Sequence, residues 1–105
     1  LGENIGDLGG LTIAHRAFVL SQKDKPSPVI DGFTGEQRFF MSWAQIWAYK
    51  FREEALRRQI AQGPHSPAPF RGNGTLMNMP EFMKAYEVKP GDKMYRAPEE
   101  RVKIW

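Results

Sequence analysis

Two carboxylates lie one helical turn apart near the start of this 105-residue chain. Glu3 and Asp7 are four positions apart, so a helix would place both side chains on one face. Like charges at this spacing repel mildly unless a cation or another partner lies between them. A metal ion, or a histidine bound to one, would relieve the repulsion, but the helix dipole alone also favours acidic residues near a helix start. The pair is therefore a candidate metal-site element with an ordinary structural alternative.

A histidine and an arginine form a second candidate pair. His65 and Arg71 lie six positions apart in a segment that also contains Pro64, Pro67 and Pro69. A histidine can donate a hydrogen bond to an oxyanion, and the planar fork of an arginine can hold a carbonyl or carboxylate group. Each side chain could instead bind backbone carbonyls of its own loop, so the pair alone does not define a function.

The chain cannot assemble a complete zinc site of the common two-histidine, one-glutamate type. It contains no cysteine, and neither of its two histidines belongs to an HExxH motif. His15 lies too far along the first predicted helix to share a metal with Glu3, because each helical residue rises about 1.5 Å. We interpret His15 as structural.

The two carboxylates fall in a predicted helix. Apolar residues recur at near-helical spacing from Gly2 to Gln22. Gly6, Gly9 and Gly10 each weaken a helix by roughly 0.5–1 kcal/mol relative to alanine. We therefore expect a neighbouring element, inside or outside this chain, to approach the helix backbone closely and stabilise it.

A second helix is predicted to begin after a proline-containing loop at residues 23–32. Thr34 is suited to cap this helix, with Gln37 as its capping-box partner. An aromatic face follows at spacings of three and four residues, which is more typical of a core than of a partner-binding surface. The residues of this face are Phe40, Trp43, Trp47 and Phe51.

The pair that includes His65 falls in a segment predicted to be irregular. Opposite charges four residues apart support a helix over residues 53–58, either continuous with the preceding helix or separated from it near Arg52. Gly63 and Pro64 end it. Prolines and glycines from residue 63 to residue 78 then predict a stiff loop, and Pro80 begins a short helix.

Composition excludes several classes of function. A length of 105 residues suits one small domain. The net charge of +3 is dispersed along the chain and interleaved with acidic residues, which predicts an ordinary surface and no nucleic-acid partner. Apolar runs are far shorter than the ~20 residues that a membrane span requires. Leu1 is not a start methionine, and no targeting segment is recognisable.

Taken together, these segments resemble the neprilysin-like zinc metallopeptidases, the gluzincin group that includes endothelin-converting enzymes and bacterial oligopeptidases. Four separated motifs match in order and with similar gaps along the whole chain, and Trp105 corresponds to the family's final residue. The motifs are Glu3-Asn4-Ile5-Gly6-Asp7 with Gly9-Gly10-Leu11, Phe33-Thr34 with Glu36-Gln37 and Phe39-Phe40 followed by Ala44-Gln45 and Trp47, His65-Ser66-Pro67 with Phe70-Arg71, and Gly74-Thr75-Leu76 with Asn78-Met79-Pro80-Glu81-Phe82.

The resemblance implies a role for each candidate residue. Glu3 would be the third ligand of one zinc ion, whose two histidine ligands and catalytic glutamate lie in an HExxH motif upstream of Leu1. Asp7 would orient one of those histidines. His65 would stabilise the oxyanion, and Arg71 would hold a backbone carbonyl of the peptide substrate. The family's reaction is the hydrolysis of peptide bonds in oligopeptides by a zinc-activated water.

The resemblance also implies an all-α fold. Residues 1–105 would be the C-terminal helical part of a larger, mainly α gluzincin-type catalytic domain, inactive without the remainder of that domain. Val102 occupies a position at which animal members carry cysteine, which favours a bacterial member over a secreted, disulfide-braced animal one. A periplasmic or secreted bacterial location is expected in preference to a cytoplasmic one. The alternative is a non-catalytic, truncated paralogue that binds a protein partner through the aromatic helix face.

Overall fold

The computed structural model describes residues 1–104, and the predicted match at Trp105 lies outside this range. Within it, the chain is helical, and its extended pairing is limited to a single bridge between Ile30 and Phe33. The predicted all-α fold class is confirmed. The helices are α1 (Gly2–Ser21), α2 (Gly35–Ile46), α3 (Glu53–Gln62), α4 (Ala68–Leu76), α5 (Pro80–Ala85) and the 3-10 helix η1 (Pro98–Glu100).

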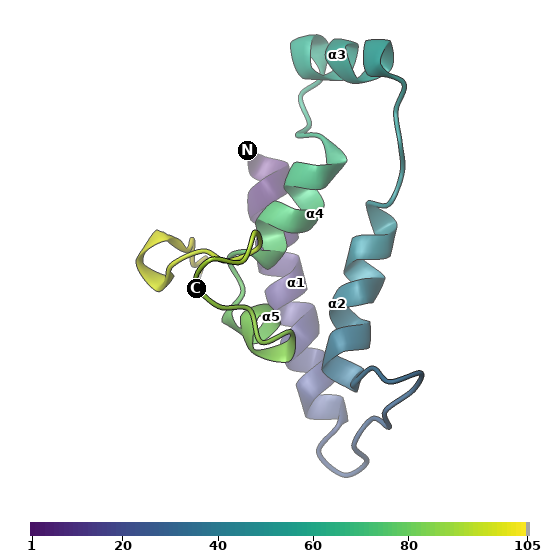
Figure 1. Ribbon diagram of the computed structural model, residues 1–105, viewed down its shortest axis with the longest axis vertical. Coiled ribbons are helices and arrows are strands. Elements are labelled where there is room, and N and C mark those ends of the chain that lie inside the picture. The colour runs from purple at the N-terminus through teal and green to yellow at the C-terminus, as the bar shows by residue number, and fades with distance from the viewer. Residues whose placement is uncertain (105) are drawn as a thin grey trace.

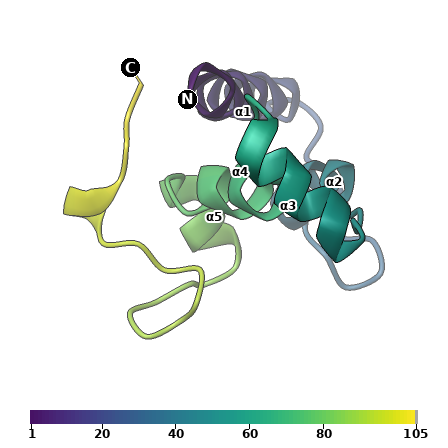
Figure 2. The same ribbon diagram turned by 90° about the horizontal axis from the view of Figure 1, so that it is seen from above.

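The two longest helices, α1 and α2, lie along the long axis of the molecule, and α4 contacts both of them (Figure 1). Helix α5 packs against α2, whereas α3 stands apart at one end. Seen along that axis, the segment after α5 loops away from the helices and returns toward α1 (Figure 2). No helix within residues 1–104 is long and apolar enough to cross a membrane.

Helix α1 confirms the first predicted helix to within one residue. It buries Leu8 and Leu11 in the core. A Cβ atom added at Gly6 or Gly10 would meet nothing within 4 Å, so the described residues do not supply the close neighbour expected at these two glycines. That expectation stays a prediction.

Helix α2 begins as its sequence predicts. The Thr34 hydroxyl accepts a hydrogen bond from the Gln37 backbone N–H at 3.1 Å, and the Gln37 side chain accepts one from the Thr34 N–H at 3.0 Å. This reciprocal arrangement is a capping box, and it satisfies two of the N–H groups that the first turn leaves without helical partners. The N-terminus of α2 is therefore fixed by local sequence.

The aromatic face of α2 is largely a core face, as expected. Phe40 is only 1% exposed, and Trp43 packs against the same cluster. Phe51 does not belong to this face, because α2 ends at Ile46 and Phe51 is 48% exposed. The buried members of the cluster are Leu8, Leu11, Phe40, Leu76, Met79, Phe82 and Met83.

The prediction of an irregular loop from residue 63 to residue 78 is wrong for the second half of this segment, where residues Ala68–Leu76 form α4. Pro67 and Pro69 stand at the N-cap and in the first turn, where a missing N–H removes no helical hydrogen bond. Helix α4 buries Ala68 and Leu76, and Gly72 lets the Trp47 side chain approach closely. Tertiary packing therefore offsets the weak helix propensity of its glycines.

The other two predicted helices are present. The sequence left open whether the helix over residues 53–58 continues the preceding helix or is separate. It is separate, because α2 ends at Ile46 and α3 begins at Glu53 and ends at Gln62, directly before Gly63. None of the α3 residues is buried. Helix α5 begins at Pro80 as predicted and places Phe82 in the core.

Candidate functional site

Helix α4 brings Arg71 against both carboxylates of α1. The Arg71 Nε atom donates to Asp7 Oδ2 at 2.7 Å, and Nη2 donates to Asp7 Oδ1 at 2.8 Å. The same Nη2 reaches Glu3 Oε2 at 3.1 Å. Arg71 is therefore the cation that relieves the repulsion between the two carboxylates. Sequence reasoning foresaw the need for a cation or partner at this place without identifying an arginine.

The buried side of the site is the pair formed by Asp7 and Arg71, whose side chains are 11% and 15% exposed. Two parallel charge-assisted hydrogen bonds hold the guanidinium in a defined plane. The hydrogen bonds to Asp7 raise the pKa of Arg71 above its ordinary value, the negative charges of Asp7 and Glu3 add to this effect, and burial opposes it. Arg71 is thus a fixed positive charge at any pH that the protein meets.

The exposed side of the site is formed by Glu3 and His65, which are 49% and 52% exposed. His65 lies in the loop before α4, and its Nδ1 atom is 3.6 Å from Glu3 Oε1, beyond ordinary hydrogen-bond distance. Both side chains remain accessible to a bound molecule. All four residues singled out in the sequence therefore meet where α1, α4 and the α3–α4 loop come together.

The chain supplies at most part of a metal site. Residues 1–104 contain no group of three or more histidine, cysteine, aspartate and glutamate side chains that could hold a metal ion. Glu3 offers one half-exposed carboxylate. This donor suits zinc as a single ligand, and at least two further ligands would have to come from residues outside the described chain.

Two residues of the site were not foreseen. Trp47, which sequence reasoning had assigned to the aromatic face of α2, lies with its ring centroid 4.4 Å from Arg71 Cζ. Gly72, the neighbour of Arg71, accepts a hydrogen bond from Trp43 Nε1 at 3.2 Å through its carbonyl oxygen. The signals that the sequence offers are two tryptophans one helical turn apart and a glycine directly after the candidate arginine. The sequence does not show that these two segments are in contact.

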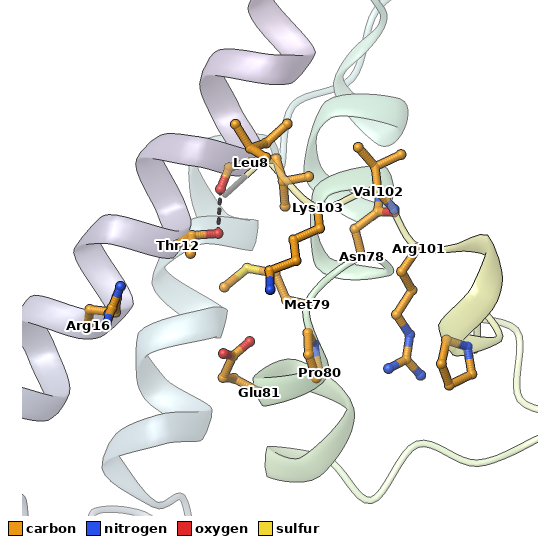
Figure 3. Close-up of a pocket in the computed structure, with 12 residues that line it drawn as sticks. Leu8, Thr12, Arg16, Asn78, Met79, Pro80, Glu81, Arg101, Val102 and Lys103 are labelled. Carbon is orange, nitrogen blue, oxygen red and sulfur yellow. Dashed lines mark hydrogen bonds between the residues drawn. The ribbon is translucent and has the colours of Figure 1, made fainter.

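A cavity lies away from these residues. A cavity of about 570 Å³ separates the middle of α1 from the C-terminal segment (Figure 3). Thr12 and Arg16 line it from α1, and Arg101 and Lys103 line it from the opposite side (Figure 3). None of the four candidate residues lines it, so the candidate site lies outside this cavity.

Solved structures share this arrangement of helices. A cryo-EM structure of the zinc metalloprotease Zmp1 of Mycobacterium tuberculosis in its open state matches 99% of this chain with a TM-score of 0.93, at 51% sequence identity. A crystal structure of the same protease with an inhibitor matches with the same TM-score and identity. Each match spans 16% of the protease chain. The fold is thus that of a helical segment of a zinc metalloprotease.

The sequence comparisons give the family. Neprilysin-3 of Drosophila melanogaster is 38% identical over 109 residues, and a neutral endopeptidase of Lactococcus lactis is 38% identical over 105 residues. Both matches cover 100% of this chain, but the chain spans only 14% and 15% of the length of these relatives. The sequence pattern of peptidase family M13 matches residues 1–102. The chain belongs to this family, which confirms the resemblance to neprilysin-like enzymes.

Proposed function

We propose that this chain is the C-terminal part of the catalytic domain of a zinc metalloendopeptidase that hydrolyses peptide bonds in oligopeptides. The observation that carries the proposal is the meeting of Glu3, Asp7, His65 and Arg71, whose first and last members are 68 residues apart in the sequence. Membership of peptidase family M13 supports it. A periplasmic or secreted bacterial location is part of the same proposal.

The carboxylates would serve the metal. Glu3 would be the ligand that this chain contributes, because its carboxylate is half-exposed and its Oε1 atom makes no hydrogen bond among residues 1–104, with His65 Nδ1 3.6 Å away. Asp7 would orient one of the upstream histidine ligands by accepting its ring N–H. Arg71 holds both carboxylates in place, so the donor geometry would be set before metal arrives.

The two basic residues would serve the substrate. Arg71 uses Nε and Nη2 for the carboxylates, and its Nη1 makes no hydrogen bond among the described residues. That atom can donate to a backbone carbonyl of a peptide. His65 is exposed beside Glu3 and can donate to the oxygen of the scissile carbonyl as negative charge develops there.

Zinc, when bound, lowers the pKa of a water molecule so that it can attack a carbonyl carbon at neutral pH. Two histidine ligands and the glutamate that takes the water's proton would have to come from an HExxH motif outside this chain. The segment alone is therefore inactive in this proposal. Adding zinc and a peptide to the isolated chain should give no cleavage.

The alternative, a binding module that uses the aromatic face of α2, has less support. Phe40 is buried and Trp43 packs against the core, so a partner could reach little of that face. Trp47 faces Arg71. No contact in residues 1–104 favours the binding module over the peptidase.

The proposal is tested in the full-length protein with a Glu3→Gln variant. Glutamine keeps the size of the side chain but is a poor zinc ligand, so bound zinc after dialysis and chelator-sensitive peptide cleavage should both be lost. Glu53→Gln is the matched control, because Glu53 is an exposed carboxylate on α3 whose ion pair is with Arg57 and not with a candidate residue. Full zinc content and full activity in the Glu3 variant would contradict the proposal.

A further inference from the structure

The indole ring of Trp47 covers one face of the Arg71 guanidinium. Arg71 Cζ lies 4.4 Å from the ring centroid, within the range of a cation–π contact. Asp7 binds the edge of the same guanidinium through two hydrogen bonds. The carboxylate fixes the direction of the fork, and the indole restricts its rotation out of the plane. Three helices, α1, α2 and α4, thus meet at one cation.

The backbone beside Arg71 is shaped to admit this ring. A Cβ atom added at Gly72 would lie 3.2 Å from Trp47 Cβ and 3.3 Å from Trp47 Cδ1, closer than ordinary van der Waals contact. Gly74, two residues further along α4, would meet nothing within 4 Å. The glycine next to Arg71 therefore permits a close approach, whereas the second glycine of the helix faces open space among the described residues.

The indole is not explained by packing alone. Trp47 Nε1 is buried and has no hydrogen-bond partner among the described residues, a condition that lowers stability. A phenylalanine would fill much of the same apolar space without a buried N–H group. A tryptophan, however, attracts a cation more strongly than any other aromatic side chain. The contact with Arg71 therefore accounts for the residue type at position 47.

We infer that Trp47 is a positioning residue for substrate binding, which acts by holding Arg71 in the orientation that presents its free Nη1 to the peptide. The inference rests on the proposed function of Arg71 and goes beyond it. The ligand that Trp47 serves is a backbone carbonyl of an oligopeptide. Trp47 itself need not touch the substrate, because its effect passes through the guanidinium.

A substitution that removes the ring face should therefore weaken substrate binding more than it slows the chemical step. Trp47→Leu should raise KM for a peptide about two- to thirtyfold, the range that corresponds to a cation–π contact, with kcat little changed. Trp47→Phe keeps a ring face and should recover most of the affinity. A general loss of packing would instead lower the yield of active protein without this split between KM and kcat.

The decisive experiment is a double-mutant cycle in the zinc-loaded, full-length enzyme. Trp47→Leu, Arg71→Ala and the double variant are compared by KM. If Trp47 acts through Arg71, the double variant has the KM of Arg71→Ala alone. Independent, multiplying effects would overturn the inference while leaving the proposed role of Arg71 intact. An unchanged KM in Arg71→Ala itself would overturn that role, and the inference with it.

A second pair of variants leaves the tryptophan in place. Gly72→Ala puts a methyl group against Trp47 and should raise KM toward the lower end of the same range, because the ring must shift away from Arg71. Gly74→Ala makes the same change in helix propensity with no atom to displace, and should leave KM unchanged. Equal effects of the two substitutions would contradict the inference.

Discussion

Arg71 and Asp7 are 64 positions apart in sequence and joined by two parallel hydrogen bonds, from Nε to Oδ2 at 2.7 Å and from Nη2 to Oδ1 at 2.8 Å. Both side chains are mostly buried. A fork-to-fork pair of this kind fixes distance and plane together, which a single hydrogen bond cannot do. It links the helix that carries both carboxylates to the helix that carries the candidate substrate-binding group.

Arg71→Lys should therefore behave as a severe change. Lysine keeps the positive charge but can offer only a point charge to Asp7, so at least one charge-assisted hydrogen bond is lost. We expect kcat/KM of the full-length enzyme to fall about tenfold or more. Arg57→Lys, an exposed arginine paired with Glu53 on α3, is the matched control and should have no effect. Equal activity of the two variants would contradict the assigned role of Arg71.

His65→Ala should lower turnover without unfolding the protein. The side chain is 52% exposed, its Nδ1 atom lies 3.6 Å from Glu3 Oε1, and it makes no hydrogen bond within the described part of the chain, so little packing is lost. Loss of one donor to a developing oxyanion should reduce kcat about 10²–10³-fold, with KM nearly constant. His65→Gln retains an N–H donor and should recover part of the loss. Normal kcat in the alanine variant, or loss of bound zinc, would argue against this role.

Local sequence was sufficient for the elements that are stabilised locally. The capping box of Thr34 and Gln37 and the proline start of α5 each depend on residues within one helical turn, and both are present. Helix α4 was missed because its stability is not local. Its glycines disfavour a helix in isolation, and the contact that compensates comes from Trp47, 25 positions before Gly72.

The site shows the same division. The spacing of Glu3 and Asp7 predicted two carboxylates on one face, and the structure has them there. Nothing in the spacing alone predicted that Arg71 would be their cation. The grouping of all four residues came from the resemblance to a family, because contacts across 62 to 68 positions leave no periodic signal in one sequence.

His15 and Glu36 should stabilise the packing of α1 on α2. His15 is 6% exposed, its Nε2 atom lies 2.5 Å from Glu36 Oε2, and its ring stacks on Phe40 at 5.4 Å. His15→Ala removes both the pair and the aromatic contacts, and should destabilise this region by about 2–4 kcal/mol. Glu36→Gln alters only the half-exposed partner, and should cost about 0.5–1.5 kcal/mol.

Hydrogen–deuterium exchange of the α1 and α2 peptides in the full-length protein measures this local stability. Exchange should be faster in His15→Ala than in Glu36→Gln, because only the first change removes the packing of the ring in addition to the hydrogen bond. Equal exchange in the two variants would show that the packing of the ring adds little. Bound zinc should be unchanged in Glu36→Gln, because Glu36 lies on α2 and contacts none of the four candidate residues in the described chain.

Tyr86 should make stability fall at alkaline pH. Its hydroxyl donates to the Gln37 carbonyl oxygen at 2.9 Å, and burial raises the pKa of the phenol above its ordinary value of 10.0. The folded state therefore favours the neutral phenol more than the unfolded state does. The resulting stabilisation is fully present below pH 10, and it is lost as the pH rises from there through the higher folded-state pKa.

The Tyr86→Phe variant isolates this contribution. Well below pH 10 the wild type should be more stable, by about 0.5–1.5 kcal/mol, because it keeps the hydrogen bond to Gln37. Above pH 10 the difference in denaturation midpoint should shrink, since only the wild type must keep an ionising phenol in a partly buried position. A difference that stays constant across this range would show that the Tyr86 environment does not disfavour the phenolate.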